Sequence, residues 1–471
     1  MLHYIFKPLL WLLGLYTLFA LIGSTVPWLE QKEVTGTEDS AIPVLTDFFG
    51  TAPGPDRVRL AEDPADAFNI RIQMLRRASR TLDITYHTMD SSDCMEAFLG
   101  ETLLAADRGV KIRIMLDGKV GAAGKARKSI RALAEHENIS IRLYNPFHLF
   151  QPWKWHCVLH DKFIVTDQTY ALLGGRNIGE RYYAPRGYKK EVTNDRDIFV
   201  WNTAGSGADG SGVTQITAYM DLLWESPDTV TLSGKTNSEL LIRLPASLKE
   251  FETDNPQFYQ KNMSDYKNES LPANKVTLVY NPIHTGPKEP VIGFILKELA
   301  LLSSQEVLLQ TPYATANKHL LTAMEEISAN TELNLVTNSL ASSPNFPAYS
   351  NYHYNKRKFL KTGANLWEYQ SKHSIHGKSA VIDNRLSAVG SYNMDDRSFY
   401  IDTETMLIVD SPEFARVLTS AIRNYQDQAL MVGEDSRYLS SDSVAEITAP
   451  PIKKAIMFLA SVFSRLFQFL I

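Results

Sequence analysis

Cysteine is scarce in this chain of 471 residues, which contains only Cys94 and Cys157. Two cysteines cannot build a disulfide framework, and they leave the redox compartment open. His156, Cys157 and His160 lie close together, as metal ligands often do, but no second ligand cluster of the zinc type follows. We therefore expect no metal and no other cofactor.

An excess of positive charge is also absent. The chain has 48 Lys and Arg against 53 Asp and Glu, a formal net charge of −5. Proteins that bind nucleic acid usually carry a basic surface, so this balance does not favour a nucleic-acid partner. A hydrophobic content of 44% with 21% charged residues is typical of a globular protein, and the length suggests two or three domains.

One pattern of polar residues occurs twice. In each copy a lysine follows a histidine by two residues, an aspartate follows the lysine by five, and a G-x-x-N segment begins after six intervening residues. The first copy consists of His160, Lys162, Asp167 and Gly174–Asn177, and the second of His376, Lys378, Asp383 and Gly390–Asn393.

Both copies have the composition of β-strands. Residues 163–165 and 380–382 are largely apolar and β-prone. Alternate residues of a strand share a face, so each histidine lies on the same side as its lysine. A histidine can attack phosphorus or carry a proton near neutral pH, and a lysine can hold a phosphate oxygen. Two such sets facing each other could place a nucleophile and a proton donor in line across one phosphorus.

These copies resemble the paired motifs of the phospholipase D superfamily. The second extends to GSYNMDDRS (Gly390–Ser398), which is similar to the bacterial cardiolipin synthase branch. LYNPF (Leu143–Phe147), GGRNIG (Gly174–Gly179) and TNSLA (Thr337–Ala341) are similar to its C-type members. The resemblance covers roughly residues 60–440. It implies an α/β fold of two similar halves, related by pseudo-twofold symmetry, with the site at their junction.

The resemblance also implies a covalent phosphohistidine. One histidine attacks the phosphodiester and the other protonates the departing alcohol; family habit favours His160 as the nucleophile and leaves His376 as the acid and base. Lys162 and Lys378 are expected to neutralise the non-bridging oxygens. Asn177 and Asn393 can donate amide hydrogens to the same oxygens, and Ser391 can add a hydroxyl. The first copy has Gly175 where the superfamily usually has serine.

The acidic residues have two possible uses. Asp167 and Asp383 fall at or beyond the far end of their strands, where capping a turn and a part in catalysis both remain open. A nucleophilic histidine needs an acceptor on its other nitrogen. We predict that Glu404 serves His376 in this way and that Asp195 or Asp197 serves His160. The alternative for all three is a solvated acid at the start of a strand.

Both ends of the chain are apolar. Leu9–Val26 carries no charge and is near the minimum length of a membrane span, so residues 1–28 are predicted to form an anchor. A cleaved signal peptide and a buried helix are the alternatives. Lys7 and the amino terminus precede the span and Lys32 follows it, which leans toward a catalytic body outside the cytoplasm. Residues 441–471 are predicted to end in a membrane-associated helix, with packing on the protein's own core as the alternative.

The remaining boundaries follow the rhythm of strands and helices. Residues 29–60 are predicted to be a tether, 61–235 the first half, 236–272 an irregular connection, and 273–440 the second half. The predicted function is a cardiolipin synthase of the bacterial inner membrane that transfers a phosphatidyl group to phosphatidylglycerol, from phosphatidylglycerol or phosphatidylethanolamine. The alternatives are a phospholipase D, a phosphatidylserine synthase, a nuclease of the same superfamily, and a protein that only binds phosphate.

Overall fold

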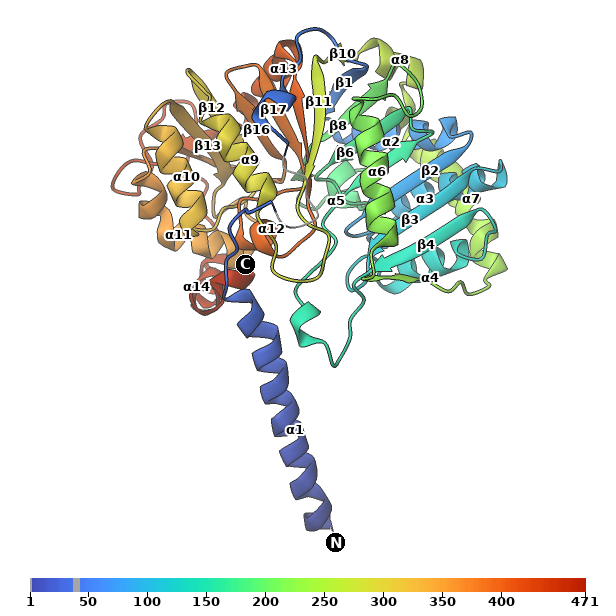
Figure 1. Cartoon of the computed structure of the whole chain (residues 1–471), viewed down its shortest axis with the longest axis horizontal. Helices are drawn as coiled ribbons and strands as arrows, with labels where there is room; N and C mark the ends of the chain where they lie inside the picture. Colours follow the sequence, from blue (N-terminus) through green and yellow to red (C-terminus); the bar gives the residue numbers. More distant parts are fainter. Residues whose placement is uncertain (1, 37–42) are drawn as a thin grey trace.

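Two α/β halves lie side by side in the computed structural model, which describes residues 2–36 and 43–471 (Figure 1). The first half is built on a sheet in the order β10-β1-β8-β6-β5-β2-β3-β4-β9, and the second on a sheet in the order β11-β18-β17-β16-β12-β13-β14-β19. The central orders β6-β5-β2-β3-β4 and β17-β16-β12-β13-β14 correspond strand by strand. The predicted fold of two similar phospholipase D-type halves is thereby confirmed.

The strands of the first sheet are β1 (Asp56–Ala61), β2 (Thr81–Tyr86), β3 (Lys111–Asp117), β4 (Ile139–Tyr144), β5 (Phe163–Thr166), β6 (Tyr170–Gly174), β8 (Asp197–Asn202), β9 (Thr229–Thr231) and β10 (Leu271–Pro272). Those of the second are β11 (Lys275–Tyr280), β12 (Glu306–Gln310), β13 (Glu332–Asn338), β14 (Asn365–Tyr369), β16 (Lys378–Ile382), β17 (Leu386–Gly390), β18 (Thr405–Asp410) and β19 (Ala429–Met431).

Three hydrophobic clusters fill the space around the sheets. One lies between the first sheet and its outer helices, and a second between the second sheet and its own outer helices. A third joins the inner faces of both sheets, with Val165 and Val381 on strands and two further helices packed against them. The outer helices are α2 (Pro64–Arg77), α3 (Asp93–Asp107), α4 (Gly124–Leu133), α9 (Val291–Ala300), α10 (Lys318–Ser328) and α11 (Phe346–Leu360), and the inner ones are α6 (Gly212–Glu225) and α13 (Pro412–Gln426).

The segment 236–272 is not the irregular connection that its sequence suggests. It forms α7 (Ser238–Asp254), η4 (Pro256–Tyr259) and α8 (Met263–Asn268), and Leu244, Leu248 and Phe251 of α7 are buried in the core of the first half. These residues recur at helical spacing. Pro245 lies inside the helix and hides the pattern, because proline usually ends a helix.

Helix α1 (Leu2–Thr25) projects from one end of the molecule (Figure 1). Among the described residues, Phe6–Trp28 is the one stretch long and apolar enough to cross a membrane, with a mean hydropathy of 1.9 and none of its best window buried. The predicted tether is only partly extended. It follows the short helix η1 (Val26–Trp28) and contains η2 (Leu45–Phe48), whose Phe48 is buried, and most of β1. Its residues 37–42 lie outside the described part of the chain.

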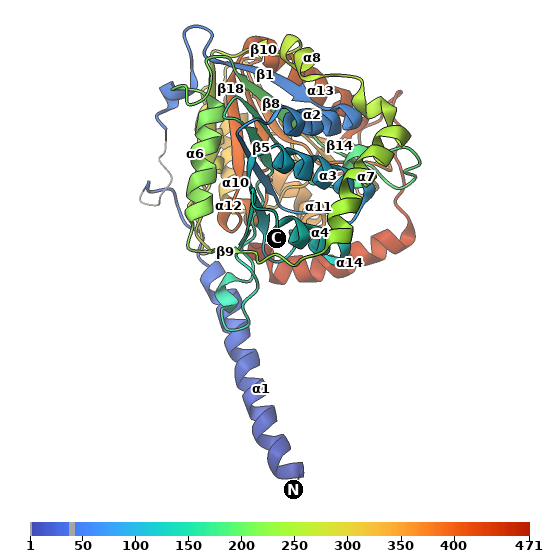
Figure 2. The same ribbon diagram turned by 90° about the vertical axis from the view of Figure 1, so that its right-hand side faces the viewer.

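Helix α14 (Pro451–Leu466) runs across the end of the molecule from which α1 projects (Figure 2). It packs on α11 through the hydroxyl of Ser464, which accepts from Ser350 at 3.0 Å. Ile452, Phe458 and Leu459 point to solvent. One face of α14 thus packs on the second half, as one of the two sequence-based alternatives expected. The opposite face is apolar and exposed, as a membrane-associated helix would be.

Candidate active site

Each motif histidine is positioned by backbone from the opposite half. The strand β15 (Ser374–Ile375), just before His376, pairs in parallel with β7 (Thr193–Asn194) of the first half. The backbone N–H of His376 donates to the carbonyl of Asn194 at 2.6 Å. Likewise the N–H of His160 donates to the carbonyl of Thr403 at 3.2 Å. This exchange brings two residues that are 216 positions apart to one junction.

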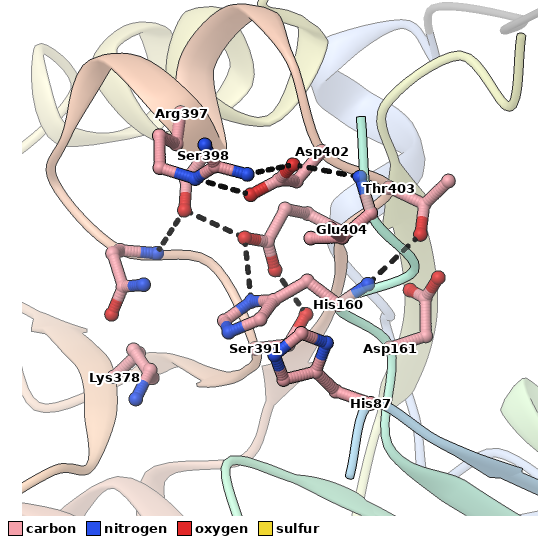
Figure 3. A network of polar contacts seen from close by, with 12 residues as sticks. His87, His160, Asp161, Lys378, Ser391, Arg397, Ser398, Asp402, Thr403 and Glu404 are labelled. Atoms are coloured by element: carbon pink, nitrogen blue, oxygen red, sulfur yellow. Dashed lines mark hydrogen bonds and ion pairs between the residues drawn. The ribbon is translucent and has the colours of Figure 1, made fainter. Parts of the chain in front are cut away.

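The partners of the two imidazoles also cross between halves. Nδ1 of His160 bonds Oε1 of Glu404 at 2.8 Å (Figure 3), and Nδ1 of His376 bonds Oδ2 of Asp195 at 2.5 Å. The prediction that each acid serves the histidine of its own half is therefore wrong. The two acids are equivalent in the fold, since each stands two residues before the strand residue that pairs with Gly174 or Gly390.

Asp197 takes no part in holding a histidine. Its carboxylate lies 3.0 Å from Nη1 of both Arg71 and Arg176, and all three side chains are buried. The difference is one of position along the chain: Asp195 lies between β7 and β8, beside the junction, whereas Asp197 is the first residue of β8 (Asp197–Asn202) and pairs with Gly174 in the first sheet. Asp197 therefore balances two buried guanidinium groups, and it was wrongly counted among the catalytic acids.

The motif lysines lie against their own histidines. The ammonium of Lys378 is 2.8 Å from Nδ1 and 3.1 Å from Nε2 of His376, and it donates to the carbonyl of His376 at 2.6 Å. Lys162 donates to the carbonyl of His160. Figure 3 shows Lys378 beside the imidazole of His160 as well. Two cations and two imidazoles thus meet at the junction of the halves.

Burial dominates the protonation of this cluster. It lowers the pKa of Lys162 to about 7 and that of Lys378 to about 8, while Glu404 and Asp195 oppose the shift. Burial and the neighbouring lysine lower the pKa of His376 to about 4 and that of His160 well below its usual range. Both imidazoles are neutral near pH 7. With Nδ1 bonded to an acid, each keeps a lone pair on Nε2.

The two acids differ in their own protonation. Burial raises the pKa of Glu404 well above the usual range of a carboxyl, against the opposing charge of Lys162. Burial acts to raise the pKa of Asp195 too, but the charges of His376 and Lys378 outweigh it and leave the pKa below its ordinary value. Asp195 is therefore ionised near pH 7 beside His376, whereas Glu404, beside His160, is protonated more easily than an ordinary carboxyl group.

Ser391 in the second copy and Gly175 in the first occupy equivalent positions, and each lies beside the acid of its own half. The hydroxyl of Ser391 donates to Oε2 of Glu404, and that of Ser398 donates to Oε1 at 2.6 Å. In the first copy a Cβ on Gly175 would stand 2.2 Å from Oδ1 of Asp195. The shorter acid comes closer to the backbone, so only glycine fits at this position. Ser391 thus orients Glu404.

The two motif asparagines have different surroundings. Asn177 is committed on both sides of its amide, because Oδ1 accepts from the N–H of Thr88 at 3.1 Å and Nδ2 donates to Tyr182 at 3.2 Å. Oδ1 of Asn393 is buried and has no hydrogen-bond partner among the described residues. That oxygen is an acceptor and cannot bond the acceptor oxygens of a phosphate, so only Nδ2 of Asn393 could donate to one.

The motif aspartates lie at the opposite ends of their strands and are committed to backbone. Asp167 accepts from the N–H groups of Ser79, Arg80 and Thr81. Asp383 accepts in the same way from the N–H groups of residues 304–306. Both have positive φ, 51° and 50°, at the turn after the strand. The structure therefore supports a capping role: each aspartate caps the loop before β2 or β12. Neither lies in the catalytic cluster.

Three further residues belong to the site but were not predicted. The ring of His87 lies 5.0 Å from that of His160, centroid to centroid, and its Nδ1 bonds the carbonyl of Leu159 at 2.7 Å. The ring of Tyr182, in α5 (Glu180–Tyr183), lies 6.0 Å from that of His376. Ser398, in α12 (Asp396–Tyr400), orients Glu404. His87 directly follows β2, and ligand sites in α/β sheets often occur where strands end.

Residues 71–194 and 296–425 match the model of the family described as "Cardiolipin synthase, PLD-like domain". The chain belongs to this family. The match covers one segment in each half, so it includes both copies of the repeat. It confirms the resemblance drawn from the sequence motifs, and it places the chain among phospholipid-modifying enzymes of the phospholipase D superfamily.

Individual relatives agree with the family. Cardiolipin synthase C of Escherichia coli is 22% identical over 78% of this chain and 84% of its own length. An uncharacterised protein of Helicobacter pylori is 26% identical over 80% of both chains. Among solved structures, a phosphatidylserine synthase of Haemophilus influenzae superposes with a TM-score of 0.61 at 12% identity, covering 88% of this chain and 95% of that one. This last likeness concerns the fold.

Proposed function

We propose that this protein is a cardiolipin synthase that transfers a phosphatidyl group from one phospholipid to a hydroxyl of phosphatidylglycerol. The observation that carries the proposal is the crossed pair of bonds, Glu404 to His160 and Asp195 to His376, with a lysine beside each imidazole. Such a junction offers a nucleophile, a proton donor and two cations to one phosphodiester. Cardiolipin synthase C of E. coli, a relative over most of the chain, supports the choice of reaction.

In the first step, Nε2 of His160 attacks phosphorus and the bond to the departing alcohol breaks. His376 enters this step protonated on Nε2, a form stabilised by Asp195 and by the negative charge of the bound phosphodiester, and it gives that proton to the alcohol. Lys162 and Lys378 hold the non-bridging oxygens. In the second step the hydroxyl of phosphatidylglycerol gives its proton back to His376 and attacks phosphorus. The phosphorus–nitrogen bond then breaks and His160 is restored. Atoms and charges balance without a metal or a nucleotide.

The two acids support this division of labour. Asp195 is a firm anion and stabilises the imidazolium form of His376, as a general acid requires. The pKa of His160 lies well below its usual range, so this ring remains a neutral nucleophile. The opposite assignment would place the anion Asp195 beside the nucleophile and not beside the proton donor.

The membrane supplies the substrate in this proposal. Phe150 of the loop 146–156 packs edge-on against Tyr16 of α1, with ring centroids 6.2 Å apart, and Trp153 packs against Phe19 at 6.4 Å. Helix α14, which carries exposed apolar side chains, lies at the same end of the molecule (Figure 2). If α1 spans the bacterial inner membrane, this loop and α14 meet its surface, and Lys7 with the amino terminus favours a catalytic body outside the cytoplasm.

To test the reaction, the full-length protein in detergent is incubated with phosphatidylglycerol in the presence of a chelator. We expect cardiolipin and glycerol by thin-layer chromatography and mass spectrometry, and neither product from His160→Asn or His376→Asn. Phosphatidic acid alone would identify a hydrolase. Phosphatidylserine formed when serine is added would favour the function of the Haemophilus structural neighbour. Phosphatidylethanolamine, offered as a labelled donor, determines whether it is also used.

A further inference from the structure

An apolar cavity of about 400 Å³ lies between the second sheet and the helices α9 and α10. Apolar side chains from both layers form its walls, among them Val307, Leu309, Leu320, Met324, Ala380 and Met406. Polar residues lie toward its edge, where Lys297 pairs with Glu326 at 2.6 Å. An apolar interior with a polar edge is the usual form of a site for an elongated apolar ligand.

The cavity shares a wall with the catalytic centre. Tyr392 and Met394 line it, and they alternate with Ser391, which orients Glu404, and with Asn393. On the neighbouring strand β16, Ala380 lines the cavity and stands two residues after Lys378, so both side chains lie on one face of the sheet. A molecule whose phosphate lies between the histidines can therefore extend a chain along this face.

A buried hydroxyl in the wall has no partner. Tyr392 is 4% exposed, and its hydroxyl makes no hydrogen bond to any described residue. It lies against α9, where a Cβ on Gly293 would come within 2.6 Å of it. Buried hydroxyls are nearly always bonded, so this one points to an oxygen supplied by a ligand. An ester carbonyl next to an acyl chain is such an acceptor.

The mouth of the cavity lies beside the segment that follows the membrane helix. Glu33 and Val34 line it, and Gln31 donates to Oδ1 of Asp396 at 3.1 Å, which fixes this segment over α12. Glu33 stands five positions after Trp28, the last residue of the candidate span. An extended chain of this length covers at most about 17 Å, so the mouth lies close to a membrane that α1 enters.

We propose that this cavity holds one acyl chain of the phospholipid substrate while its phosphate lies between His160 and His376. The hydroxyl of Tyr392 donates to the ester carbonyl of that chain. The proposal rests on the proposed function in that it assumes a phospholipid at the catalytic centre. It adds the place where the lipid tail binds, and it explains why apolar walls border the polar junction on the side of the second half.

Photo-crosslinking tests this without turnover. The full-length protein in nanodiscs is illuminated with phosphatidylglycerol that carries a diazirine in one acyl chain, and labelled peptides are identified by mass spectrometry. We expect labels on Val291–Ala300 and Lys318–Ser328 of the native protein. Labels confined to α1, or a free diazirine fatty acid that labels the two helices equally well, would overturn the proposal.

Filling the cavity provides the matched comparison. Ala323→Trp places a large ring inside it, whereas Glu325→Trp places the same ring on the exposed side of the same helix. We expect labelling of α9 and α10 to fall at least 10-fold in the first variant and to remain in the second. Equal labelling in both would contradict the proposal, as would an equal loss in both.

The same variants separate this proposal from the proposed reaction. Ala323→Trp should lose about 10-fold in kcat/KM on dipalmitoyl phosphatidylglycerol and keep its rate on the dihexanoyl lipid, whose chains are too short to need the cavity. Tyr392→Phe should raise KM for the long-chain lipid with little change in kcat. If crosslinking succeeds but no cardiolipin is made with either lipid, the proposed reaction fails while the acyl site stands.

Discussion

The carboxylate of Glu404 holds the imidazole of His160 across the boundary between the two halves, 2.8 Å from Nδ1. The reciprocal bond joins Asp195 to His376. Neither half therefore contains a complete histidine–acid pair. The chain must fold both copies of the repeat, and dock them, before either imidazole is oriented. Activity therefore requires that the two halves are docked.

Removing the charge of either acid should impair catalysis and leave the fold intact. In Asp195→Asn the imidazole of His376 loses its anionic partner, and in Glu404→Gln the imidazole of His160 loses the carboxyl oxygen that Nδ1 bonds. We expect kcat to fall by about 10²-fold or more in each. The melting temperature should change little, because both substitutions nearly preserve shape. Wild-type rates in both variants would show that the crossed pairs do not serve catalysis.

The converse is expected for Asp197→Asn. This substitution leaves Arg71 and Arg176 buried without their anion. Breaking a buried ion pair on one side costs about 3–5 kcal/mol, so denaturant unfolding should begin at a much lower concentration. The comparison with Asp195→Asn is sharp, since the two aspartates are two positions apart and the predicted losses are of different kinds. An Asp197→Asn protein as stable as the wild type would refute this reading.

The motif aspartates should behave as caps. Asp167→Ala and Asp383→Ala each remove an acceptor for three backbone N–H groups, and we expect a loss of about 1–2 kcal/mol in the free energy of unfolding. The rate per folded molecule should remain near that of the wild type. A large fall in kcat without loss of stability would restore the catalytic role that the sequence left open.

These caps also predict a pH effect. Burial acts to raise the pKa of Asp167, but hydrogen bonds from Thr81 and Ser79 outweigh it, so the pKa is lower in the folded protein than in the unfolded chain. Its contribution to stability is therefore present above the ordinary carboxyl range and is lost as pH falls through the folded pKa. The stability difference between wild type and Asp167→Ala, measured by urea unfolding, should narrow below about pH 4.

The sequence predicted the chemistry of this site better than its connections. Histidine, lysine and asparagine were found because their spacing repeats, and spacing is a local property. Which acid reaches which imidazole depends on how the halves dock, and pseudo-twofold symmetry makes pairing within a half and pairing across halves look alike in sequence. Asp195 and Asp197 are acids two positions apart, and the sequence does not show that β8 begins at Asp197, which places Asp195 beside the junction and Asp197 inside the first half.

The prediction of an irregular connection at 236–272, where α7 lies, was wrong for another reason. The buried residues of α7 have helical spacing, but Pro245 interrupts the pattern and polar residues surround it. Pro245 is the eighth of the 17 residues of α7, beyond the first turn in which a proline is tolerated. Local propensity was overridden by the burial of Leu244, Leu248 and Phe251 against the first half.

Phosphate binding should weaken at alkaline pH. The pKa of Lys162 is lowered to about 7 and that of Lys378 to about 8, mainly by burial. The ammonium groups lose their charge as pH rises through these values, so kcat/KM should decline above about pH 7. In Lys162→Arg the side chain stays charged, and the decline should move to higher pH even if the maximum rate is lower. An unchanged profile in this variant would assign the decline to other groups.

The loop beside α1 should enter the membrane surface. Phe150 is 70% exposed and lies next to Tyr16 of α1, whereas Ile242 is 76% exposed on α7. Both native cysteines are buried, so a cysteine introduced at either position can be labelled selectively with an environment-sensitive dye. In liposomes the dye on Phe150→Cys should shift to shorter wavelength and be quenched by brominated lipid, and the dye on Ile242→Cys should report water. Equal spectra at the two positions would mean that this loop stays above the bilayer, and that α1 and α14 alone meet it.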